Sequence, residues 1–234
     1  MQSAAHTPAS VPAVAAGRAA LVIGGTGRIG RAVVAAVAAG GHDVAVHCHA
    51  ALPAARELAA ALGGRSLAVT ADLREEGAVR ALVHRVIDHF GRLDAVVVCG
   101  RRHVPTPLDD VTAADLRAHF DVNVAGGFVV AQEAGAVMVA QDTGGVIVFV
   151  GGAEAGPARP GDVPFLASNA ALPGLAHGLQ VEFAARSPRV RVSCVEPGDA
   201  DPAAIAAAVI GLVVPGIGFP SPTASKPTVR EDRV

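Results

Sequence analysis

A glycine-rich segment near the start of the chain has the spacing that phosphate binding requires. Residues 24–30 read Gly-Gly-Thr-Gly-Arg-Ile-Gly and lie between an apolar run at 19–23 and an amphipathic run at 31–39. A glycine turn between a strand and a helix lets backbone N–H groups at the helix start approach a pyrophosphate, and the helix dipole attracts negative charge. The segment therefore predicts a nucleotide-phosphate site, with a tight turn that binds nothing as the alternative.

Alternating strand and helix patterns continue on both sides of this turn. Further strands are predicted at 43–49, 66–70, 95–98, 146–150 and 189–195, and helices at 75–90, 111–141, 164–185 and after Pro202. Such alternation predicts a single α/β domain with a doubly wound parallel sheet, covering residues 18–214. We expect residues 1–17 to be a disordered leader and residues 215–234 an irregular tail, because both are rich in proline or small polar residues.

The composition excludes several classes of function. A formal net charge of −2 gives no basic surface for nucleic acid or an anionic membrane. The apolar run after residue 201 is interrupted by prolines and glycines, so we expect no membrane span. Three scattered cysteines beside apolar runs indicate reduced thiols in a cytoplasmic protein, without a disulfide or a metal site. Of 19 basic residues only Lys226 is a lysine, which is typical of a GC-rich coding genome.

Several segments resemble motifs of the short-chain dehydrogenase/reductase family. The glycine turn, Asp72, the frame F-L-A-S-N at 165–169 and the Pro197–Gly198 turn each stand where that family has a motif. The resemblance runs from about Arg18 to Val214. It implies a Rossmann-like fold with a dinucleotide in the cleft at the ends of the strands.

The resemblance also implies a set of cofactor-binding residues. The middle glycine of the family's turn is Arg28 here, which resembles the pteridine reductases, as does the pair His47 and His49 at the end of the second strand. We interpret the two histidines as a polar cofactor edge or as surface residues, because no third metal ligand lies near them in sequence. No acid ends this strand, and Arg28 could meet a 2′-phosphate, so NADP(H) is favoured. The predicted cofactor-binding residues are Gly24, Thr26, Arg28, Ile29, Gly30, His49, Asp72, Leu73, Pro197 and Gly198.

The positions that carry the family's chemistry hold other residues. The catalytic Ser falls on Gly152, the Tyr on Phe165 and the Lys on Asn169, while a helical Asn is retained as Asn123. Carbonyl reduction needs a proton donor at the developing alkoxide, and a phenyl ring cannot supply one. The chain contains no tyrosine that could substitute. The resemblance therefore implies an active site in which no catalytic residue except Asn123 is intact.

Two more family features are altered. The N-N-A-G motif after the fourth strand reads Val98-Cys-Gly-Arg101, so the resemblance puts Arg101 and Arg102 near the nicotinamide. The substrate lid that follows the Pro-Gly turn is missing, since the final helix begins almost at once at Pro202. Without the lysine contact to the ribose, we expect NADP(H) binding to be weak or vestigial.

Three functions remain open. The first is a non-catalytic subunit of an NADP(H)-dependent short-chain oxidoreductase in bacterial secondary-metabolite (antibiotic) biosynthesis. It would pair with a catalytically active homologue, as a heterotetramer, through the helices at 111–141 and 164–185. The second is an oxidoreductase with a rebuilt active site that uses Glu154, His103 or Asn169. The third is an NADP(H)-binding sensor or scaffold. We favour the first, because several independent replacements are difficult to reconcile with a reductase that acts alone.

Overall fold

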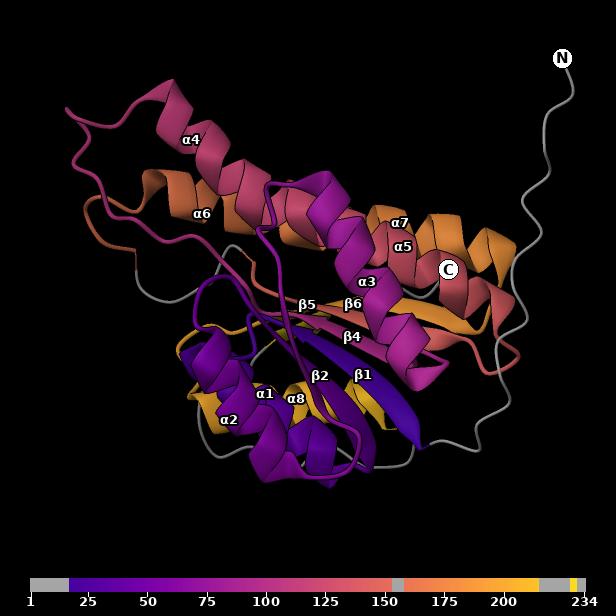
Figure 1. Ribbon diagram of the computed structural model, residues 1–234. Helices are drawn as coiled ribbons and strands as arrows, with labels where there is room; N and C mark the ends of the chain where they lie inside the picture. Colours follow the sequence, from indigo (N-terminus) through magenta and orange to yellow (C-terminus); the bar gives the residue numbers. More distant parts are fainter. Residues whose placement is uncertain (1–16, 153–157, 215–227, 231–234) are drawn as a thin grey trace, which may run out of the picture.

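The part of the chain that the structure describes forms one seven-stranded sheet with helices on both faces (Figure 1). The structure is a computed structural model, and it describes residues 17–152, 158–214 and 228–230. The strand order is β3-β2-β1-β4-β5-β6-β7, in which the first six strands are parallel and β7 runs antiparallel to β6. The strands are β1 (Arg18–Ile23), β2 (His42–Cys48), β3 (Leu67–Thr70), β4 (Ala95–Val98), β5 (Gly145–Val150), β6 (Val190–Glu196) and β7 (Thr228–Arg230).

The central strands are apolar along their whole length because both faces of the sheet are covered. All four residues of β4 are buried, and so are the last five residues of both β1 and β5. Continuous burial of this kind is typical of parallel sheets between two helix layers. The doubly wound fold predicted from the sequence is thereby confirmed.

Two helix layers enclose the sheet (Figure 1). On one face, α1, α2 and α8 cover a core that includes Val34, Ala55 and Val209. On the other face, α3, α5 and α7 cover a core that includes Val83, Val130 and Phe183. The helices are α1 (Arg28–Ala39), α2 (Leu52–Leu62), α3 (Glu76–Phe90), α4 (Ala113–Phe120), α5 (Gly126–Ala140), α6 (Val163–Ala170), α7 (Leu172–Arg186) and α8 (Pro202–Val213).

The long helix predicted at 111–141 contains an irregular turn. It begins with the expected capping box, in which Thr112 Oγ accepts a hydrogen bond from the Asp115 amide at 3.2 Å and Asp115 Oδ2 accepts one from the Thr112 amide at 2.9 Å. A π-helical turn, Asp121–Ala125, then joins α4 to α5. The combined helix Ala113–Ala140 is long and apolar enough to cross a bilayer, but half of its most apolar window is buried inside the protein, as in the core helix of a domain.

Three other elements differ from the prediction. The helix predicted at 164–185 is divided at Ala171, and Pro173 lies in the first turn of its second part, α7. Helix α2 occupies a segment to which the sequence patterns assigned no element. The tail predicted to be irregular contains β7, which pairs with the edge strand β6. Residues 1–16 of the predicted leader lie outside the described residues.

Candidate functional site

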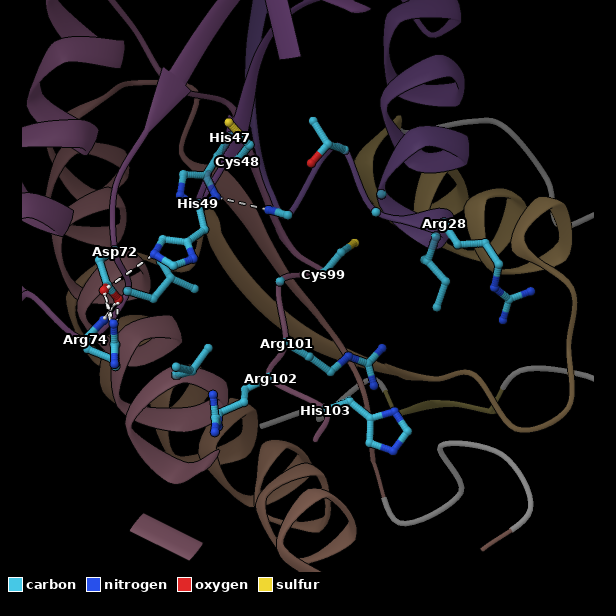
Figure 2. Close-up of a pocket in the computed structure, with 18 of the residues that line it drawn as sticks. Arg28, His47, Cys48, His49, Asp72, Arg74, Cys99, Arg101, Arg102 and His103 are labelled. Carbon is cyan, nitrogen blue, oxygen red and sulfur yellow. Dashed lines mark hydrogen bonds and ion pairs between the residues drawn. The ribbon is translucent and has the colours of Figure 1, made fainter. Parts of the chain in front are cut away.

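A cavity of about 800 Å³ opens at the carboxyl ends of the strands. It lies where β1 leads to β2 on one side and pairs with β4 on the other. In doubly wound sheets this reversal of strand order is where ligands bind. Figure 2 shows the cavity. It is lined by Gly24, Thr26, Gly27, Arg28, Ile29, Gly30, His47, Cys48, His49, Asp72, Leu73, Arg74, Cys99, Gly100, Arg101, Arg102, His103, Val104, Val122 and Phe165.

The glycine turn forms one wall of this cavity, and close approach of the backbone explains its glycines. Gly24 has a positive φ of +73°, and a Cβ there would lie 2.5 Å from Gly100 Cα. A Cβ on Gly30 would lie 2.1 Å from the Gly24 carbonyl oxygen. Helix α1 begins at Arg28, so its first amide groups have no partner within the helix. This geometry fits a pyrophosphate, whose oxygens would accept hydrogen bonds from those amides.

His47 holds the glycine turn in place through hydrogen bonds of its ring. Its Nδ1 accepts a hydrogen bond from the Gly24 amide, and its Nε2 donates one to the Ala71 carbonyl, each at 3.1 Å. The ring is 2% exposed, and burial lowers its pKa, so the neutral ring is the stable form. His47 is therefore not a surface residue, because its buried ring links three segments; it also lines the cavity, and its interpretation as a polar cofactor edge stays a prediction.

The far end of the cavity carries an acid with two basic neighbours. Asp72 lies 3.6 Å from His49 Nε2, and its carboxylate accepts hydrogen bonds from both the side chain and the amide of Arg74. These bonds hold the pKa of Asp72 at about 2, so the carboxylate is charged at neutral pH. Arg74 was not among the residues predicted from the sequence. The signal available was its position two residues after Asp72, the span of an Asx turn.

Arg28 does not lie near this group. Figure 2 shows it on the opposite side of the cavity from His49 and Asp72, with its side chain directed away from them. In this fold the adenosine ribose of a dinucleotide lies at the end of β2, and His49 is the first residue after that strand. The 2′-phosphate contact expected of Arg28 is therefore not supported, because Arg28 projects from the first turn of α1, at the pyrophosphate position.

The positions of the family's Ser and Lys are filled from other segments. A Cβ on Gly152 would lie 2.4 Å from Glu196 Oε2, so the Glu196 side chain occupies the space of a serine there. Asn169 is buried, and its Oδ1 accepts a hydrogen bond from Arg101 Nη1 at 2.7 Å. A guanidinium group from the end of β4 thus stands beside Asn169, the position at which the resemblance places the family's lysine.

Asn123 sits in the π-helical turn and ties the segment after β4 to α6. Its Oδ1 accepts a hydrogen bond from the Arg102 amide at 2.6 Å, and its Nδ2 donates to the Arg102 carbonyl at 3.1 Å and to Ser168 Oγ at 2.8 Å. The side chain is buried and does not line the cavity. In this structure it supports the backbone from which Arg101 and His103 project.

His103 lies beside Phe165, the position at which the resemblance places the family's tyrosine. Its ring centroid is 4.2 Å from that of Phe165, and its Nε2 is 2.8 Å from Asp162 Oδ1. The hydrogen bond from His103 lowers the pKa of Asp162, whose side chain is 8% exposed. An imidazole oriented by a carboxylate is a proton-transfer group. Glu154, the other acid considered for a rebuilt site, lies outside the described residues.

The turn after β6 lies apart from the cavity wall. The cavity is lined by every predicted cofactor-binding residue except Pro197 and Gly198. These two form a tight turn, with Gly198 at φ +51° and the Ala200 amide donating to the Pro197 carbonyl at 3.0 Å. Asp201 then caps α8 through the Ala204 amide at 2.8 Å. Only residues 197–201 separate β6 from α8. This short connection agrees with the sequence prediction that the substrate lid is missing.

The fold and the glycine turn define a Rossmann-like α/β protein. The family model described as "short chain dehydrogenase" matches residues 18–209. The chain therefore belongs to the short-chain dehydrogenase/reductase family.

Individual relatives agree with this assignment. A hydroxynaphthalene reductase-like protein, Arp2, of Metarhizium guizhouense is 31% identical over 85% of this chain and 72% of that protein. The uncharacterized oxidoreductase YgfF of Escherichia coli is 34% identical over 76% of this chain and 74% of its own length. Among solved structures, a short chain dehydrogenase from Burkholderia cenocepacia in complex with NADP has a TM-score of 0.76 and 30% identity, covering 85% of this chain and 91% of that one.

Proposed function

We propose that this chain is a non-catalytic subunit of an NADP(H)-dependent short-chain oxidoreductase, paired with a catalytically active homologue in a heterotetramer. We further propose that the complex works in the cytoplasm, in bacterial secondary-metabolite (antibiotic) biosynthesis. No disulfide joins Cys48, Cys99 and Cys194 to one another, which is consistent with a reducing compartment. The arginine-rich, lysine-poor composition supports an origin in a GC-rich genome.

The observation that carries the proposal is the set of groups at the centre of the site. Phe165 faces the cavity with a phenyl ring, Asn169 is engaged by Arg101, and Glu196 fills the space at Gly152. None of these arrangements supplies the hydroxyl, phenol and ammonium groups with which the family transfers a proton to an alkoxide. The chain alone is therefore expected to lack the family's reaction.

Cofactor binding is the function that the cavity retains. The amides of the glycine turn and Arg28 would hold the pyrophosphate, while His49 and Arg74 would meet a 2′-phosphate at the far end. A bound nicotinamide dinucleotide supplies a hydride in this family. A related structure holds NADP, which supports the choice of cofactor. We propose weak binding, because Asn169 cannot replace a lysine contact to the ribose.

The proposed pairing surface is the outer face of the helix layer formed by α4, α5 and α7. Leu116, Phe128 and Val181 are 38%, 38% and 44% exposed, and each belongs to one of these helices. Large apolar side chains on adjacent outer helices are candidates for burial in a subunit interface. An obligate interface of this kind buries on the order of 2,000 Å² or more.

The test is co-expression with a catalytically intact homologue encoded beside this gene, followed by native mass measurement and NADPH-oxidation assays. We expect a defined heterotetramer whose activity depends on the partner's tyrosine. Phe128→Glu, on the proposed surface, should weaken assembly, whereas Asp88→Lys on α3 is the matched control. A well-behaved monomer that neither binds nor activates such a homologue would overturn the proposal.

One observation favours a second function, an oxidoreductase with a rebuilt acid–base site. His103, held by Asp162, stands next to Phe165 at the mouth of the cavity. If it transfers the proton, the purified chain alone reduces carbonyl substrates with NADPH, and His103→Gln abolishes that turnover while leaving cofactor affinity unchanged. Turnover that survives His103→Gln would remove this candidate.

A further inference from the structure

Arg101 places a positive charge in the half of the cavity that lies away from His49 and Asp72. It follows β4, and its Nη1 donates a hydrogen bond to Asn169 Oδ1 at 2.7 Å. Figure 2 shows Arg101 and His103 pointing to one side of this segment and Arg102 to the other. Two adjacent arginines of the cavity wall therefore present their charges in different directions.

No negative group among the described residues forms an ion pair with Arg101. Burial raises the pKa of the nearby Cys99 thiol to about 12, so this thiol is neutral. The Sγ atom of Cys194 donates a hydrogen bond to the Gly151 carbonyl at 3.0 Å. Burial lowers the pKa of Arg101 itself, but a guanidinium remains protonated at neutral pH.

The orientation of a dinucleotide follows from the two ends of the cavity. The adenosine ribose belongs at the end of β2, beside His49, and the pyrophosphate belongs at the start of α1. The second nucleoside must then extend over the end of β4, toward Arg101 and Phe165. Its ring is a cation in NADP+ and is neutral in NADPH, so the two forms differ by one charge where the Arg101 charge lies.

We propose that Arg101 makes this site selective for the reduced dinucleotide, so that the chain binds NADPH more tightly than NADP+. This inference rests on the cofactor binding proposed above. Two unit charges about 10 Å apart, at an effective dielectric constant of about 20, repel one another enough to change affinity roughly tenfold. The chain would accordingly fill with cofactor only where the reduced form predominates.

The test compares binding of NADPH and NADP+ by titration calorimetry in wild type, Arg101→Gln and the matched control Arg102→Gln. We expect wild type to bind NADPH at least about tenfold more tightly than NADP+. Arg101→Gln should strengthen NADP+ binding by about tenfold and change NADPH binding by less than about twofold, because only the oxidised ring meets the charge. A gain of affinity cannot result from a misfolded variant. Arg102→Gln should leave the preference intact.

A ring-free probe, 2′-phospho-ADP-ribose, separates repulsion at the ring from effects elsewhere. It should bind equally to wild type and to Arg101→Gln. Equal affinities of wild type for NADPH and NADP+, or an equal effect of Arg102→Gln, would overturn the selectivity and leave cofactor binding standing. Failure of NADPH and of the ring-free probe to bind wild type would overturn the proposed cofactor binding, and the selectivity with it.

Discussion

Replacing His47 should loosen the glycine turn and lower the stability of the fold. In His47→Ala the Gly24 amide and the Ala71 carbonyl lose the partners that they now have at 3.1 Å. Each partly buried group left without a hydrogen bond costs about 1–2 kcal/mol. We expect His47→Ala to lower the free energy of unfolding by about 2–4 kcal/mol at pH 7.5.

The pH dependence of stability gives a sharper test of the same ring. Burial, the main cause, lowers the pKa of His47, so the unfolded chain binds a proton more readily than the folded one. The stabilising effect of the neutral ring is fully present above the unfolded pKa of about 6.5 and is lost as pH falls toward the folded pKa. Burial also lowers the pKa of His42, so this residue contributes with the same sign. Each ring can contribute up to about 1.4 kcal/mol per pH unit.

His47→Gln separates titration from packing, because glutamine keeps a donor and an acceptor but does not titrate. Between pH 6.5 and 5.5, its free energy of unfolding should fall less steeply than that of wild type, by up to about 1.4 kcal/mol per pH unit. The measurement is urea unfolding followed by far-UV circular dichroism, since the chain has no Trp and no Tyr to report by fluorescence. Identical slopes for wild type and His47→Gln would refute the assignment of His47 as a buried neutral ring.

Three further variants test the site and its support. Gly30→Ala should abolish dinucleotide binding in calorimetry, because its Cβ would lie 2.1 Å from the Gly24 carbonyl oxygen; unchanged affinity would contradict this account of the turn. Gly135→Ala should lower the free energy of unfolding by about 1–3 kcal/mol, because its Cβ would lie 2.1 Å from Phe183 Cζ; the matched control is the open position Gly178→Ala. Phe165→Tyr combined with Asn169→Lys should not restore carbonyl reduction in an NADPH-oxidation assay, since Gly152 provides no hydroxyl; robust turnover would show that the Tyr and Lys suffice.

Most of the sheet could be predicted because its strands are buried apolar runs between turn residues. Strand β4 was predicted with its observed bounds, Ala95–Val98. Helix α2 was missed although Pro53 stands in its first turn, because its N-cap, Ala51, makes no side-chain capping bond. Strand β7 is defined by its pairing with β6, which a local pattern does not contain.

The parts of the cavity formed by a single segment could be predicted from the sequence. The parts formed where distant segments meet could not. The glycine turn lines the cavity because its spacing determines its own shape. The bond between His47 and Gly24 joins residues 23 positions apart, and the bond between Arg101 and Asn169 joins residues 68 apart. The filling of the Gly152 site by Glu196 depends on the adjacent strands β5 and β6. Such contacts follow from the assembled fold, so sequence reasoning could name Arg101 but not its partner.

The π-helical turn Asp121–Ala125 accommodates one extra residue between α4 and α5. A π turn carries one residue more than an α turn over nearly the same rotation, so it accommodates the extra residue while keeping the relative orientation of α4 and α5. If the same residues formed a regular α-helix throughout, everything on α4 would be rotated by about 100° relative to α5. His119, whose Nε2 now accepts a hydrogen bond from the Val104 amide at 3.4 Å, would turn away from the segment that it holds. The π turn thus keeps the two halves of the helix in their relative orientation, and a regular α-helix of the same sequence would present a different face of α4 to the cavity wall.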